Sequence, residues 1–399
     1  MNAALSPADR ALCRELCCGV VRWQSALDWL VARKTGGRTQ RADLLNLLRL
    51  GLYQLFWLDR VPDHAAVHET VELAKRLGFG SQAGFVNALL RGYTREADET
   101  HRALDALKQT DPHTGWSHPD WLVARWQARL GVADTARLLE WNNTPPPTYA
   151  RLNTIKTAAA GTLLDRWREE GVEYDFGRWD WIGENSVFRL KSHPSLATLG
   201  SFRDGGFYVQ DPSTLLAVHL LDVQPSQTVL DLCAAPGGKT MLIAAQMQNQ
   251  GRIVAVDVDA VRLKLVQENC ARLGVTCVET VAVENFDAPP ASFDRILIDA
   301  PCSNTGVMRR RVDLRWRIRA EEIARLVKTQ LALLKKAAPL LKPGGSLVYS
   351  TCSLEMEENG ALVRSFLAEH PNLALEAERE LVPFKDGVDG AYVVGLRAS

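Results

Sequence analysis

Several features are missing from this sequence of 399 residues, and each absence excludes a class of protein. No apolar run reaches the roughly 18 residues that a membrane-spanning helix needs, so we expect no membrane protein. Residues 1–10 are polar and contain no apolar signal-peptide core. Basic and acidic side chains balance at 47 each, so nucleic-acid binding would have to come from local patches and not from net charge.

The 8 cysteines form neither a CxxC pair nor a cluster with histidine. This spacing argues against a zinc site, and we expect no metal centre. Cysteines without a pairing pattern are typical of reduced thiols, which predicts a cytoplasmic protein.

Two common nucleotide-binding motifs are also missing from the glycine turn that follows Asp231. A P-loop needs glycine where Cys233 stands, and the pattern G-x-G-x-x-G is absent, so neither an ATPase nor an NAD-binding protein is indicated. An apolar strand, a glycine turn and a helix still form the first unit of a nucleotide-cofactor fold. The residues expected to hold a smaller adenosine ligand are Cys233, Ala234, Ala235, Pro236, Gly237, Gly238 and Lys239.

Three domains are predicted along the chain. Residues 1–108 are expected to be all-helical, because Leu44, Leu48, Leu52 and Leu55 recur on one helical face. A turn-rich linker follows, and residues 119–204 predict a small α+β subdomain with strands at 148–153 and 186–190 and a helix at 162–170. Tryptophans are concentrated near this subdomain, which favours packing over stacking on RNA bases.

Residues 205–399 alternate apolar strands with helices, which predicts a parallel sheet covered on both faces. Ligands bind beyond the carboxyl ends of the strands in such a sheet. The expected strands are 228–230, 253–256, 278–283, 295–298 and 346–350, and the expected helices are 241–248, 260–273, 323–338 and 359–369.

Acidic residues follow the second and third of these strands. Asp257 is placed to accept hydrogen bonds from both hydroxyls of a ribose. Either Glu284 or Asp287 could accept from an adenine amino group.

The fourth and fifth strands end in Asp299-Ala300-Pro301-Cys302-Ser303 and Thr351-Cys352-Ser353, so two thiols and a carboxylate reach the rim that holds the cofactor loop. Two thiols beside a cofactor indicate either a disulfide couple or covalent nucleophilic catalysis. Because the cysteines come from different strands, catalysis is favoured.

Two resemblances to known families cover nearly the whole chain. Segments 12–22, 51–55, 62–72 and 85–91 resemble the NusB-type RNA-binding helical domain, in the form fused to small-subunit ribosomal RNA methyltransferases; that form usually carries one further helix ahead of Asp9. Segments 231–240, 299–303 and 351–353 are similar to the motifs of RNA cytosine-C5 methyltransferases, and segments 151–153, 207–213, 305–310 and 358–359 agree.

The resemblance implies a multidomain protein with a NusB-like domain, a small RRM-like subdomain and a Rossmann-like class I methyltransferase domain. It implies methylation of C5 of a cytidine in 16S ribosomal RNA, with S-adenosylmethionine as cofactor. Cys352 would add to C6 of the cytosine, Asp299 would bind N3 and the amino group, and Cys302 would assist product release. Lys239 could position Asp299 or lower a thiol pKa.

An arginine-rich segment follows the fourth strand and contains Arg309, Arg310 and Arg311. Beside a base-modifying site we interpret these three as RNA phosphate contacts. The same chemistry on transfer RNA, or a non-catalytic RNA-binding assembly factor, are the alternatives. We expect a monomer that binds 16S ribosomal RNA.

Overall fold

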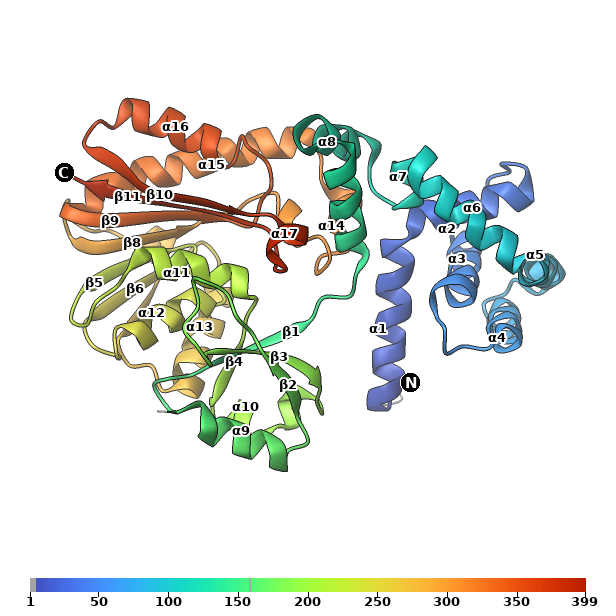
Figure 1. The fold of residues 1–399 in the computed structure, drawn as a ribbon, viewed down its shortest axis with the longest axis horizontal. Helices are drawn as coiled ribbons and strands as arrows, with labels where there is room; N and C mark the ends of the chain where they lie inside the picture. The colour runs from blue at the N-terminus through green and yellow to red at the C-terminus, as the bar shows by residue number, and fades with distance from the viewer. Residues whose placement is uncertain (1–4, 158) are drawn as a thin grey trace. The chain divides into compact units, whose positions relative to one another are not determined.

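The computed structural model describes residues 5–157 and 159–399, and the chain forms two compact units (Figure 1). The first contains the residues up to Pro145 together with Met308–Arg317. The second contains Pro146–Val307 and Ile318–Ser399. The chain therefore leaves the second unit once, contributes a short segment to the first, and returns.

The first unit is built from helices, and no strand occurs among its described residues. Leu44, Leu48 and Leu52 are 5%, 0% and 0% exposed, which confirms the predicted apolar face. Helix α8 lies within the range 119–204 that we predicted for the small subdomain, and it groups with this unit. The α-helices are α1 (Pro7–Arg22), α2 (Gln24–Thr35), α3 (Ala42–Trp57), α4 (Asp63–Arg76), α5 (Ala83–Arg95), α6 (Ala97–Thr110), α7 (Pro112–Gly115), α8 (Asp120–Asn143) and α14 (Leu314–Arg317).

The second unit begins with a small four-stranded antiparallel sheet in the order β2-β3-β1-β4. Trp167 is fully buried beneath it, with its ring centroid 5.3 Å from those of Phe188 and Phe207, so this tryptophan packs in the core as predicted. The elements are β1 (Thr148–Leu152), α9 (Ala160–Glu169), β2 (Glu173–Phe176), β3 (Val187–Ser192), α10 (Gly200–Arg203) and β4 (Phe207–Val209).

The larger sheet of this unit has seven strands in the order β10-β11-β9-β8-β5-β6-β7. The strands from β5 to β9 are parallel, which confirms the prediction for this part. The strands are β5 (Thr228–Leu232), β6 (Arg252–Asp257), β7 (Val278–Ala282), β8 (Phe293–Asp299), β9 (Leu341–Thr351), β10 (Leu373–Leu381) and β11 (Ala391–Ala398).

The sequence analysis did not predict the C-terminal edge of the sheet, where β10 and β11 form an antiparallel hairpin on β9. The sequence held a signal for this hairpin: Glu376, Glu378 and Glu380 recur at every second position of β10, which is the period of a strand.

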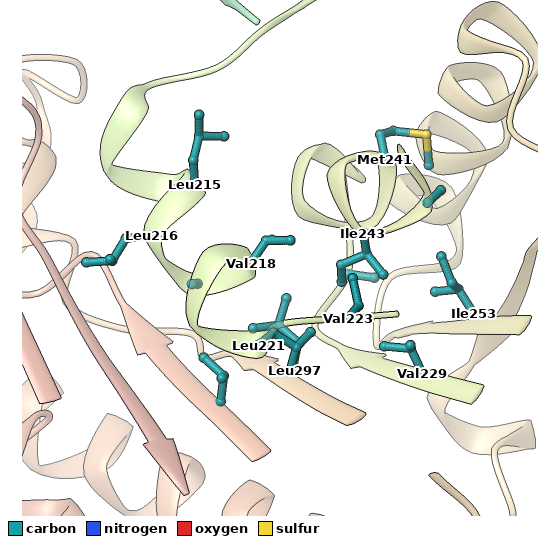
Figure 2. Close-up of a cluster of buried hydrophobic side chains, with 14 of the residues drawn as sticks. Leu215, Leu216, Val218, Leu221, Val223, Val229, Met241, Ile243, Ile253 and Leu297 are labelled. Atoms are coloured by element: carbon teal, nitrogen blue, oxygen red, sulfur yellow. The ribbon is translucent and has the colours of Figure 1, made fainter. Parts of the chain in front are cut away.

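Neighbouring residues of the central strands point into two different cores. Val229 packs among residues of α11, α12 and α13 (Figure 2), whereas Leu230 packs among residues of α15 and α16 on the opposite face (Figure 1). Burial on both faces explains why these strands are almost entirely apolar. The helices are α11 (Leu215–Leu221), α12 (Gly238–Gln246), α13 (Ala260–Leu273), α15 (Ala320–Ala337), α16 (Gly360–Glu369) and the short α17 (Pro383–Asp386).

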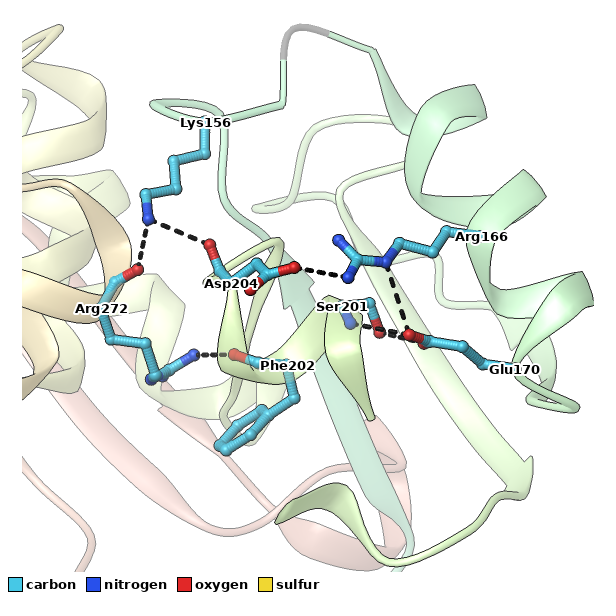
Figure 3. A network of polar contacts seen from close by, with 7 residues as sticks. All are labelled: Lys156, Arg166, Glu170, Ser201, Phe202, Asp204 and Arg272. Carbon is cyan, nitrogen blue, oxygen red and sulfur yellow. Dashed lines mark hydrogen bonds and ion pairs between the residues drawn. The ribbon is translucent and has the colours of Figure 1, made fainter. Parts of the chain in front are cut away.

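A polar network holds the small sheet on the end of α13 (Figure 3). Arg272 donates to the Phe202 carbonyl at 2.9 Å, and Lys156 donates to the carbonyls of Asp204 and Arg272 at 3.0 and 2.7 Å. At Gly205, where φ is +78°, a Cβ would lie 2.0 Å from the Arg272 carbonyl oxygen, so only glycine fits. The small sheet is thereby held against a helix of the larger sheet.

Candidate active site

The loop after β5 lines a cavity of about 240 Å³. Cys233 and Gly237 have φ values of +66° and +104°, and this tight turn leads directly into α12 at Gly238. A Cβ at Gly238 would lie 3.2 Å from atoms of Tyr208 and Gln210, so a side chain here would crowd the wall of the cavity. The lining residues are Tyr208, Val209, Gln210, Thr214, Asp231, Cys233, Ala234, Ala235, Pro236, Gly238, Lys239 and Asp299.

Asp231 is fully buried at the base of this cavity. One carboxyl oxygen accepts a hydrogen bond from Thr240 Oγ1 at 2.6 Å, and the other, Oδ1, has no hydrogen-bond partner among the described residues. Burial raises the pKa of Asp231 from 3.8 to about 7.

This raised pKa predicts a pH dependence of stability. The folded state favours the protonated carboxyl of Asp231. The contribution of this carboxyl to the free energy of unfolding is therefore complete below pH 3.8 and is lost as the pH rises through about 7. Each pH unit in this window corresponds to about 1.4 kcal/mol. Between pH 5 and pH 8 the wild type should therefore lose on the order of 2 kcal/mol relative to Asp231→Asn, measured by urea unfolding. Parallel pH profiles of the two proteins would contradict the assignment.

Asp257 supports the loop at the end of β6. It is only 4% exposed, and its carboxylate accepts hydrogen bonds from the amides of Ala235 and Asp259, each at 3.0 Å. Asp257 is not among the residues that line the cavity. Its hydrogen bonds instead fix the backbone of the loop. Its contact with a ribose stays a prediction.

The two candidates for the adenine contact lie in different places. Glu284 is exposed immediately after β7, and its role stays a prediction. Asp287 instead lines a separate cavity with Thr228 and Arg252, which begin their strands. The side chain of Phe286, which precedes Asp287, packs against the core. This placement does not fit the adenine role that we expected for Asp287.

Lys239 and Asp299 form an ion pair on the rim, with Nζ 2.6 Å from Oδ2. Ser350, which is paired with Asp299 in the β8–β9 register, donates to Oδ1 at 3.0 Å. Burial alone would lower the pKa of Lys239, but Asp299 and, more weakly, Cys352 raise it above its ordinary value. Lys239 therefore stays an ammonium and holds the Asp299 carboxylate in place.

The two cysteines meet at the same rim, as the order of their strands predicted. The sulfur atoms of Cys302 and Cys352 are 3.4 Å apart. Cys302 is buried, and its hydrogen bond with Cys352, together with burial, raises the pKa of its thiol well above the ordinary value. Cys352 is only partly buried, so it is the more accessible of the two sulfurs.

Asn304 was missed at the level of sequence, although it contacts both cysteines. Its side chain accepts a hydrogen bond from the Cys352 thiol at 3.2 Å and donates to the Cys302 carbonyl at 2.6 Å. Its φ is +58°, a conformation in which asparagine is enriched over most other residues. An asparagine two residues after Pro-Cys was the available signal.

Comparisons with known proteins agree with this geometry. Residues 218–391 match the family described as 16S rRNA methyltransferase RsmB/F, residues 1–95 match the NusB family, and residues 118–179 match the RsmF/B-like ferredoxin-like domain. The chain is 36% identical to a probable ribosomal RNA small subunit methyltransferase B of Bacillus subtilis, covering 98% of this chain and 91% of that protein. The protein belongs to the ribosomal RNA small subunit methyltransferase B family.

Other relatives extend the same similarity. The chain is 37% identical to the ribosomal RNA small subunit methyltransferase B of Cronobacter sakazakii, covering 93% of this chain and 85% of that protein. It also resembles the crystal structure of a methyltransferase homologue from Pyrococcus horikoshii, with a TM-score of 0.62 and 29% identity over 74% of this chain and 98% of that one.

In this family member the arginine-rich segment is only partly available to RNA. Arg309 is 3% exposed, and its guanidinium lies 4.2 Å from the centre of the Trp141 ring within the helical unit. A buried guanidinium stacked on tryptophan does not fit the phosphate contact that we expected for Arg309. Arg310 and Arg311 are exposed, and their contact with RNA stays a prediction.

No group of three or more metal-ligating side chains was found among residues 5–157 and 159–399. Within the same ranges, no helix combines the length and apolar character needed to cross a membrane.

Proposed function

We propose that this protein transfers a methyl group from S-adenosylmethionine to C5 of a cytidine in 16S ribosomal RNA. The observation that carries the proposal is the meeting of two cysteine sulfurs, 3.4 Å apart, beside the Lys239–Asp299 ion pair and the glycine-loop cavity. A thiol pair of this kind supports covalent catalysis on a ring that is too unreactive to accept a methyl group directly.

The residues of the loop cavity fit S-adenosylmethionine. Gly238 lines the cavity without a side chain that would crowd its wall, and the buried Asp231 Oδ1 offers an acceptor that has no hydrogen-bond partner among the described residues. Asp257 and Glu284 would reach the ribose and the adenine. Bound there, S-adenosylmethionine would supply an electrophilic methyl group.

Cys352 would act as the nucleophile. Its thiolate forms a bond to C6 of an unstacked cytosine, and the electron pair of the C5–C6 double bond makes C5 nucleophilic. Asp299, held by Lys239 and Ser350, would hydrogen-bond the N3 edge and the amino group and stabilise the ring while it is not aromatic.

Cys302 would complete the reaction after C5 has gained the methyl group. Acting as a base, its sulfur takes the proton from C5, the C5–C6 double bond forms again, and the bond between C6 and Cys352 breaks. The hydrogen bond with Cys352 and burial raise the pKa of the Cys302 thiol, so Cys302 rests as a thiol and must give its proton to solvent before its sulfur can take the proton from C5.

A methylation assay tests this function. Purified protein, labelled S-adenosylmethionine and a 16S ribosomal RNA transcript should yield 5-methylcytidine at one position in bisulfite sequencing, with transfer RNA as the comparison substrate. Methylation of transfer RNA but not of 16S RNA would show that transfer RNA is the substrate. RNA binding without any methyl transfer would instead indicate an assembly factor.

We also propose that the protein works as a monomer in the cytoplasm. All cysteines are free thiols in the structure, which suits a reducing compartment. Light scattering of the purified protein would measure its mass directly.

A further inference from the structure

Glu358 is a buried acid directly behind the two cysteines, and the proposed chemistry does not yet use it. It lies between β9 and α16 and is 0% exposed. A buried carboxylate is costly unless its oxygens are well satisfied. Its hydrogen bonds therefore explain why an acid stands here.

The carboxylate accepts hydrogen bonds from the residue that follows each cysteine. Glu358 Oε1 accepts from the Ser303 amide at 2.9 Å, and Oε2 accepts from the Ser303 hydroxyl and from the Ser353 hydroxyl, the latter at 2.5 Å. The two serine hydroxyl oxygens are themselves 2.9 Å apart. One side chain thus connects the loop that carries Cys302 with the loop that carries Cys352.

A third contact fixes the position of the carboxylate. Gln330, from α15, donates to Glu358 Oε1 and to the Pro301 carbonyl, each at 2.9 Å. The Ser303 amide and the Gln330 side chain both donate to Oε1, and the two serine hydroxyls meet Oε2, where a hydroxyl can donate or accept. A carboxylate accepts at both oxygens, whereas a glutamine would replace one of these acceptor oxygens with an NH₂ group.

We propose that Glu358 is a positioning residue that sets the separation of the two cysteine sulfurs by holding the serine after each one. The proposal rests on the proposed function, since it matters only if Cys352 attacks C6 and Cys302 must then reach the proton on C5. A misplacement of about 1 Å can lower a rate on the order of 100-fold. The step that needs both sulfurs should therefore be the most sensitive.

Two RNA substrates separate this role from general damage to the fold. Complete turnover on a normal 16S transcript needs both cysteines. Formation of a stable adduct with 5-fluorocytidine RNA needs only Cys352, because fluorine at C5 cannot be removed as a proton is. For Glu358→Gln we expect turnover to fall at least about tenfold more than the rate of adduct formation, while the Kd for S-adenosylmethionine stays within about twofold.

The matched control is Glu357→Gln, a change of the same chemistry at the exposed neighbour, which should keep both rates within about twofold. If Glu358→Gln lowers both rates in proportion, or leaves turnover within twofold of the wild type, the proposal is overturned. If Glu358→Gln does not bind S-adenosylmethionine, the fall in turnover is compared with the fall in adduct formation for Ser303→Ala instead. That variant removes one hydroxyl and keeps the amide contact, so the same tenfold difference is expected. A wild-type protein without activity would instead refute the proposed function.

Discussion

Cys352→Ala is expected to abolish methyl transfer to 16S ribosomal RNA, with a loss on the order of 10⁴-fold or more. Without the sulfur no bond to C6 forms, and C5 of the cytosine stays too weak a nucleophile to take the methyl group. Cofactor binding should persist, because Cys352 is not among the residues that line the loop cavity. Incorporation of labelled methyl groups and calorimetric binding of S-adenosylmethionine measure the two effects separately.

Cys302→Ala is expected to block release of the RNA adduct, whereas Cys352→Ala blocks its formation. The first bond still forms through Cys352, but the proton on C5 has no base, so a protein–RNA adduct accumulates and survives denaturing electrophoresis. Cys13→Ala, which removes an exposed thiol from the helical unit, is the control and should leave activity unchanged. A fully active, adduct-free Cys352→Ala protein would refute the covalent mechanism.

Arg315→Ala should destabilise the helical unit by at least about 3 kcal/mol. Arg315 is 0% exposed and donates to three backbone carbonyls, those of Arg22, Ser117 and Asn142, as well as to the side-chain oxygen of Asn143. Two of these carbonyls lie in the last turns of α1 and α8, where the helix itself leaves carbonyls without donors. Each buried acceptor that loses its donor costs about 1–3 kcal/mol.

Arg317→Ala is the matched control two residues further along. The Arg317 side chain is 78% exposed and pairs with Asp313 at 3.0 Å, and an exposed pair of this kind contributes less than about 1 kcal/mol. Hydrogen exchange in α1 and α8, measured on the full chain, should accelerate strongly in Arg315→Ala and hardly in Arg317→Ala. Equal exchange in the two variants would show that Arg315 does not hold these helices.

The catalytic sheet was the most predictable part of the protein. The expected helix at 260–273 coincides with α13 (Ala260–Leu273), and each of the five expected strands lies within or beside an observed parallel strand. Strands that are buried on both faces appear in the sequence as continuous apolar runs, which are easy to recognise. Alternating strands and helices make the strands parallel, so their carboxyl ends lie at the same edge of the sheet. For this reason the order of the strands was enough to predict that Cys302 and Cys352 lie together.

Interactions between distant segments could not be predicted in the same way. Nothing in the arginine-rich segment indicates that Arg309 stacks on Trp141 or that Arg315 is buried among carbonyls contributed by residues 22, 117 and 142. The direction of the chain after Phe286 likewise decides where Asp287 lies. Each of these outcomes depends on which surface a segment meets after folding.

The sequence by itself determined the three kinds of domain, the glycine loop after β5 and the pair of cysteines, because these depend on local patterns and on the order of strands. The tertiary structure alone decided that Asn304 contacts both cysteines and that Glu358 holds the serine after each one. It also decided that the arginine-rich segment is partly a core element of the helical unit. The physical reason is that a polar side chain acquires its function from the donors and acceptors that folding places around it, and these come from residues far away in the chain.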